Sequence, residues 1–169
     1  YSKKGSADEK LKAYMYNGRV LVNAGEYEKA MDSYIIAEEY VSDCKDLIYT
    51  GLLYNCKGMV YTKIYDYEKA VQQFKLSSEF YVNANDTIRY LGAMNNISLA
   101  LMMSNSQSSN DFYFTVMEQY WSKLTLRQKS NYYACKLIST KEPEKLFNEI
   151  DLYINDIGYS PLINWLVVA

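Results

Sequence analysis

Apolar and aromatic residues recur at intervals of three and four positions along most of this chain. In the first such stretch they are Leu11, Tyr14, Met15, Gly18, Leu21 and Val22. An α-helix has about 3.6 residues per turn, so this spacing gathers them on one face of an amphipathic helix. The same pattern predicts helices at residues 7–23, 26–41, 46–64, 66–83 and 87–104, with Gly25 ending the first of them.

The later part of the chain carries the pattern in a weaker form. Residues 105–110 are a polar run with no apolar period, which predicts a loop before a third helical hairpin resumes at Asp111. Further periodic stretches at 125–139 and 143–155 predict a fourth hairpin. A short terminal helix is expected at 160–169.

The chain also nearly repeats itself after 40 residues. The segment Gly-Glu-Tyr-Glu-Lys-Ala that begins at Gly25 returns as Tyr-Asp-Tyr-Glu-Lys-Ala from Tyr65. Asp46 and Asp86 share this register, and each precedes a fresh apolar run, so both are expected to cap the helix that follows. Repeats of this kind stack into a solenoid, because one unit cannot bury its apolar face alone.

These residues resemble the tetratricopeptide repeat (TPR), a helix-turn-helix unit with a characteristic series of aromatic, glycine and alanine positions. In the first repeat the matching residues are Tyr14, Gly18, Leu21, Tyr27, Ala30, Tyr34 and Ala37. In the second they are Tyr54, Gly58, Tyr61, Tyr67, Ala70 and Phe74, with Ser77 departing from the pattern. The usual period is about 34 residues, so a period of 40 implies longer helices. Such repeats resemble those of bacterial peptide-sensing regulators and of some eukaryotic scaffold proteins, and the period alone does not choose between the two.

The resemblance implies an all-α fold, a TPR-like α-solenoid of about four antiparallel helical hairpins. We expect one domain over residues 1–169. Its clear repeats would be 11–45 and 51–85, its degenerate repeats 87–122 and 125–157. The chain begins without methionine and ends on an apolar stretch, which we interpret as a segment of a longer protein.

In this family the first helix of each hairpin lines a groove that receives a peptide. Carried over by position, the resemblance implies a partner-binding groove lined by Lys12, Met15, Arg19, Asn23, Asn55, Met59, Lys63, Asn95, Leu99 and Met102, with Val22, Leu52, Thr62 and Met103 beside them. Asparagine amides can bond a peptide main chain, and flexible thioethers adapt to side chains. The alternative is that the asparagines are solvated and the methionines fill the core.

Composition narrows the function classes. The net charge of -2 and a sequence pI of about 5.3 provide no strong basic field, so direct nucleic-acid binding is not expected. Histidine is absent, and no phosphate loop, nucleophile motif or metal-ligand spacing is found, so we predict neither an enzyme, a cofactor nor a metal site. The apolar end is shorter than the roughly 20 residues that span a bilayer.

The sequence therefore predicts a non-catalytic domain that binds a protein or peptide partner. Two alternatives remain: the ligand-sensing portion of a larger bacterial regulator, whether membrane-anchored or not, and a self-association module. The compartment is open between the cytoplasm and a bacterial periplasm or envelope. Three cysteines do not form a complete disulfide framework, and pairing of Cys44 with Cys56 in an oxidising compartment stays open.

Overall fold

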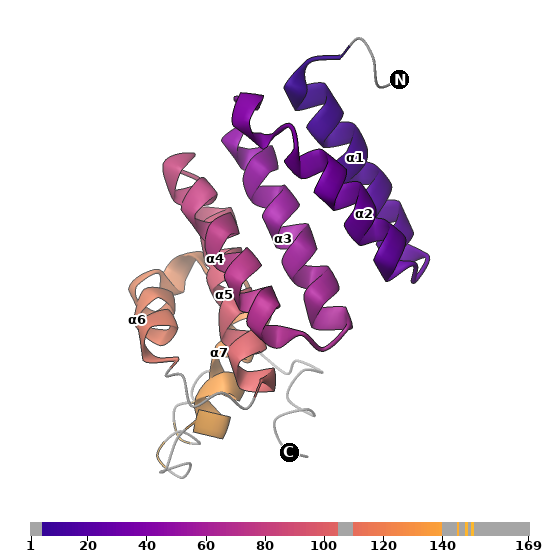
Figure 1. The fold of residues 1–169 in the computed structure, drawn as a ribbon. Helices are drawn as coiled ribbons and strands as arrows, with labels where there is room; N and C mark the ends of the chain where they lie inside the picture. The colour runs from indigo at the N-terminus through magenta and orange to yellow at the C-terminus, as the bar shows by residue number, and fades with distance from the viewer. Residues whose placement is uncertain (1–4, 105–109, 140–144, 146–147, 149, 151–169) are drawn as a thin grey trace.

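The computed structural model describes residues 5–104, 110–139, 145, 148 and 150. These residues form helices and no strand (Figure 1). The α-helices are α1 (Ala7–Asn23), α2 (Tyr27–Glu38), α3 (Leu47–Lys63), α4 (Tyr67–Asn83), α5 (Thr87–Met103), α6 (Asp111–Gln119) and α7 (Leu126–Ser139). Short 3-10 turns, η1 (Val41–Asp43) and η2 (Trp121–Lys123), precede α3 and α7. The predicted all-α fold is confirmed.

Aspartates fix where the helices of the second and third units begin. The Asp46 side chain accepts a hydrogen bond from the Tyr49 N–H at 3.3 Å, and Asp86 accepts one from the Arg89 N–H at 2.9 Å. Both predicted N-caps are therefore confirmed. Asp66 caps α4 in the same way, which the sequence analysis did not single out. Each cap satisfies a backbone donor that has no partner within its own helix.

Three left-handed residues close the turns after α1, α3 and α4. They are Gly25, Tyr65 and Asn85, with φ of 79°, 63° and 54°. In each turn the residue after the left-handed one donates its N–H to a carbonyl five residues earlier, as in the bond from Glu26 to Leu21. The connection between repeats at Asn85 thus has the same geometry as the two turns within hairpins.

Glycines allow the two helices of a hairpin to approach closely. A Cβ on Gly58 would lie 2.6 Å from two ring carbons of Phe74, and a Cβ on Gly18 would collide in the same way with Tyr34. Ala30 in α2 is fully buried at the facing surface. Gly18 and Ala30, two positions of the repeat signature, are therefore sites of close packing between α1 and α2.

The odd-numbered helices form one continuous layer, which we call the odd-helix layer. The hydroxyls of Tyr16 in α1 and Tyr49 in α3 share a hydrogen bond of 3.3 Å. Amide side chains continue these links from α3 to α5 and from α5 to α7. Helices α2, α4 and α6 alternate with them along the chain.

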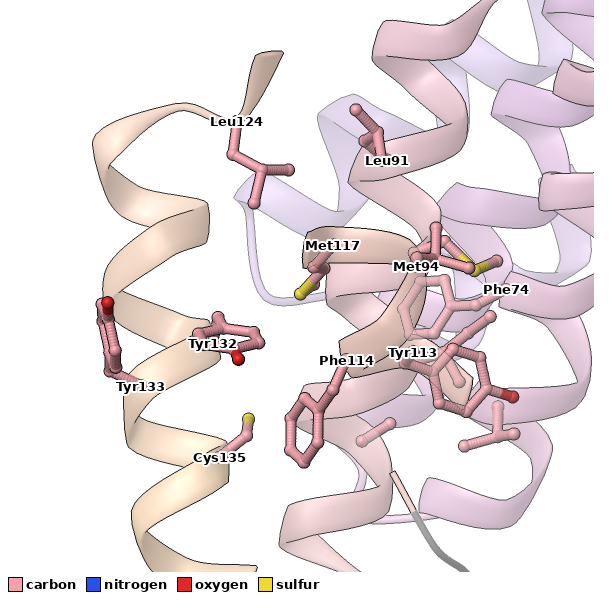
Figure 2. Close-up of a cluster of buried hydrophobic side chains, with 14 of the residues drawn as sticks. Phe74, Leu91, Met94, Tyr113, Phe114, Met117, Leu124, Tyr132, Tyr133 and Cys135 are labelled. Atoms are coloured by element: carbon pink, nitrogen blue, oxygen red, sulfur yellow. The ribbon is translucent and has the colours of Figure 1, made fainter. Parts of the chain in front are cut away.

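The core divides into two clusters. The first joins α1, α2 and α3 around Leu11, Met15, Tyr34 and Leu53. The second extends from α4 to α7, and Figure 2 shows its aromatic and methionine side chains. Within it, Phe114 of α6 and Tyr132 of α7 meet edge to face with ring centroids 5.4 Å apart. Large apolar side chains therefore hold the degenerate units in place without the repeat signature.

The sequence analysis placed most helix boundaries within one residue of those observed. Helix α2 is an exception, since it ends at Glu38 and gives way to η1 rather than continuing to residue 41. The predicted helices at 143–155 and 160–169 lie wholly or mostly outside the described residues. The division into one domain with four repeats stays a prediction.

Candidate functional site

A cavity of about 290 Å³ opens in the odd-helix layer between α1 and α3. We call it the α1–α3 cavity. Its lining residues are Arg19, Val22, Asn23, Tyr34, Leu52, Asn55, Cys56 and Met59. Four of the ten residues predicted for a groove, together with the neighbouring Val22 and Leu52, thus surround one space.

The lining is apolar at depth and polar at its mouth. Tyr34 and Cys56 form the deepest part, with exposed fractions of 1% and 5%. Burial raises the pKa of the Tyr34 phenol and of the Cys56 thiol, so both stay protonated at neutral pH. Arg19 and Asn23 are exposed at the rim. Such a space suits an apolar group that enters from a polar surface.

Aromatic rings and cations flank the cavity along α1. The Lys12 ammonium lies 4.0 Å from the centroid of the Tyr49 ring and 3.0 Å from an Asp46 carboxylate oxygen. The hydrogen bond to Asp46 is the largest of the effects that raise the pKa of Lys12. The Arg19 guanidinium lies 5.6 Å from the Tyr16 ring centroid. Lys12 is therefore held in an ion pair within the protein, whereas Arg19 forms no ion pair with a described carboxylate.

A chain of asparagine amides crosses the odd-helix layer beside the cavity. The Asn96 amide in α5 donates to the Asn55 carbonyl oxygen in α3 at 3.0 Å. In the next step the Asn131 amide in α7 donates to the Asn95 carbonyl oxygen at 3.1 Å. Asn95 and Asn96 are linked to each other at 3.5 Å. This chain joins three helices and offers amide groups along the layer.

Two predicted groove residues lie in the interior instead. Met15 is fully buried in the first core cluster with Leu53 of α3, and Asn95 is only 7% exposed. By the 40-residue period these positions are equivalent to Asn55. All three turn toward the next odd helix, so they are contacts between repeats. Assigning Met15 and Asn95 to an open groove was wrong for this geometric reason.

The remaining predicted residues differ in how open they are. Lys63 is exposed but lies one turn beyond the cavity lining. Leu99 and Met102 are partly buried against the second core cluster. Met103 is the open residue of that turn, with the same exposed fraction as Met59, 45%.

Four residues of this surface were not predicted from the sequence: Asn96, Asn131, Tyr16 and Tyr49. Asn96 stands next to a position that was singled out, and a shift of one residue rotates a helical side chain by about 100°. Tyr16 follows Lys12 by four positions and precedes Arg19 by three, so the helical spacing of Lys12 and Arg19 could have identified it. Nothing in the repeat pattern marked Asn131.

The described residues show no other chemical centre. No group of three or more potential metal ligands is present among them. The cysteines are free, and Cys44 donates its thiol hydrogen to Asp8 at 2.8 Å. Every helix in the described part also falls short of the length and apolar character that a bilayer span requires.

Comparison with known proteins places the fold. No protein-family model matches the sequence, and no curated protein matches it. Among solved structures, the chain is similar to the N-terminal domain of stress-induced protein-1 (STI-1) from C. elegans, with a TM-score of 0.61 and 16% sequence identity. The match covers 79% of this chain and 99% of that domain. At this identity the likeness shows the fold alone, a TPR-like helical repeat.

Proposed function

We propose that this domain is a non-catalytic protein-interaction module that binds a peptide segment on its odd-helix layer. The observation that carries the proposal is the α1–α3 cavity, where Arg19, Asn23, Asn55 and Met59 from two repeats surround one apolar space. A side chain entering the cavity would bury apolar area, while the rim amides bond its main chain. The TPR-like fold supports this reading.

The partially open methionines add adaptability to this surface. Met59 at the cavity and Met103 on α5 are both 45% exposed. Unbranched thioether side chains can repack around different partners. The Asn55 amide also contacts the Met59 sulfur at 3.7 Å, which ties the flexible wall of the cavity to the amide chain.

The test is an unbiased peptide selection followed by measured affinities. Peptides from a random library are selected on the immobilised protein and titrated against Met59→Ala and against Ile35→Ala. Ile35 is a matched control, because it lies on α2 with a similar exposed fraction, 51%. We expect Met59→Ala to weaken binding about tenfold and Ile35→Ala to leave it unchanged.

Equal effects of the two substitutions would remove the cavity from the binding surface. Circular dichroism of both variants checks that the helices are retained. A selection that yields no binding peptide from a diverse library would contradict the proposal as a whole.

A further inference from the structure

Charge is distributed unequally between the two sets of helices. After the first turn of α1, the odd-numbered helices contain basic residues and no acidic one: Lys10, Lys12, Arg19, Lys57, Lys63, Arg89, Arg127, Lys129 and Lys136. The charged residues of α6 are all acidic, acidic residues outnumber basic ones in α2, and α4 contains two of each sign. The net charge of -2 for the whole chain conceals this unequal distribution.

Four of these nine cations are already paired with carboxylates. They are Lys12, Lys57, Arg89 and Lys136. Near the cavity, Arg19 and Lys63 are both exposed, and neither takes part in an ion pair with a described carboxylate. The positive charge of Arg19 acts on the buried end of the cavity, because it opposes the rise that burial causes in the pKa of Tyr34. The cavity therefore lies in a field that favours anions.

The two open cations are displaced from each other along the helices. Arg19 is equivalent to Met59 by the 40-residue period, so Lys63 lies one turn, about 6 Å, further along its helix. A single terminal carboxylate would engage only one of them. Carboxylates on both sides of an apolar residue in a continuous chain would reach both.

We infer that the α1–α3 cavity receives an apolar side chain from an internal acidic segment of a partner protein, whose flanking aspartates or glutamates pair with Arg19 and Lys63. The inference rests on the proposed function and adds the chemistry of the partner. Apolar burial supplies most of the affinity, and the charges orient the segment and exclude basic competitors. The acidic residues of α2 and α6 repel the same segment from the opposite set of helices.

The probe is a synthetic peptide with one leucine flanked on each side by two aspartates, acetylated and amidated at its ends. Its affinity is measured by fluorescence anisotropy. Its position is followed from the ¹³C-methyl resonances of methionine, assigned with Met59→Leu and Met103→Leu variants. We expect binding that shifts the Met59 resonance more than that of Met103, because only Met59 lines the cavity.

Matched variants separate the contributions. Replacing the peptide aspartates with asparagine, or its leucine with serine, should weaken binding about tenfold each. Arg19→Gln should weaken it several-fold and lower its salt dependence. Arg127→Gln is the control, because it removes an exposed cation of the same layer on α7, away from the cavity.

Several results would overturn the inference. Binding of the peptide only when its C-terminus is a free carboxylate would identify a reader of chain termini. Equal binding of the asparagine peptide would remove the charge argument, and preferential binding of single-stranded oligouridylate would identify a nucleic-acid surface. Absence of binding by the aspartate peptide would also refute it. If peptides from the random library then bind through Met59 without acidic residues, the proposed function stands while this inference fails.

Discussion

Replacing Gly58 with alanine should destabilise the domain, whereas the same change at Gly92 should stabilise it. A Cβ on Gly58 would lie 2.6 Å from two carbons of the Phe74 ring and 3.0 Å from a third. Carbon atoms pack at about 3.5–4.0 Å, so the ring must retreat by about 1 Å. Phe74 is 2% exposed within the second core cluster, so its retreat must displace other buried side chains.

The expected magnitudes follow from two opposing effects. Overpacking costs about 1–3 kcal/mol, while exchanging glycine for alanine within a helix returns about 1 kcal/mol, so Gly58→Ala should lose up to about 2 kcal/mol. A Cβ on Gly92 in α5 meets no atom within 4 Å, so Gly92→Ala should gain about 0.5–1 kcal/mol. Both sit in the middle of odd-numbered helices, which makes them a matched pair.

The assay is urea unfolding followed by far-ultraviolet circular dichroism. A double-mutant cycle with Phe74→Leu adds a specific check, because the smaller side chain should relieve most of the cost of Gly58→Ala. Equal stabilisation by both alanine substitutions, or additive effects of Gly58→Ala and Phe74→Leu, would refute the close-packing argument.

Three further predictions concern the turns, a half-buried ion pair and pH. Tyr65→Gly should raise the free energy of unfolding by about 0.5–1 kcal/mol, because Tyr65 holds a left-handed φ of 63° that glycine adopts without strain, while Gly25→Ala should lower it. Glu38→Gln should lower the free energy of unfolding in urea by about 1–3 kcal/mol, because it leaves the buried Lys57 ammonium unpaired. This range is smaller than for a fully buried pair because Glu38 is partly exposed. Lys57→Met should cost less, since it leaves no buried charge. Asp8 accepts hydrogen bonds from the Cys44 thiol, which has the largest effect, and from the backbone N–H groups of Asp46 and Lys45. These bonds hold the pKa of Asp8 below its ordinary 3.8. The ionised Asp8 therefore contributes its full stabilisation above pH 3.8, and this contribution is lost as pH falls through the lowered pKa of the folded state. Asp8→Asn should flatten the pH dependence of the urea midpoint in that acidic range.

The polar and apolar pattern predicted the helices well because its causes are local. Helical period, aspartate caps and left-handed turn residues act within a few positions of the chain, and their outcome at Asp46, Asp86 and Gly25 matches the structure. The repeat signature likewise fixed the close contacts at Gly18. These features require only that neighbouring helices form a hairpin, which the short connections enforce.

The candidate surface depended on packing between hairpins, which no local pattern specifies. The angle at which α3 meets α1 decides that Met15 enters the core while Arg19, four positions on, stays open. The way α5 packs against α3 and α7 likewise decides that Asn95 reaches α7 and Asn96 reaches α3. A helix turns its side chains by about 100° per residue, so a small difference in packing exchanges buried and open neighbours. The sequence by itself thus determined the helices, their turns and their repeat, and the tertiary structure decided which residues face one another.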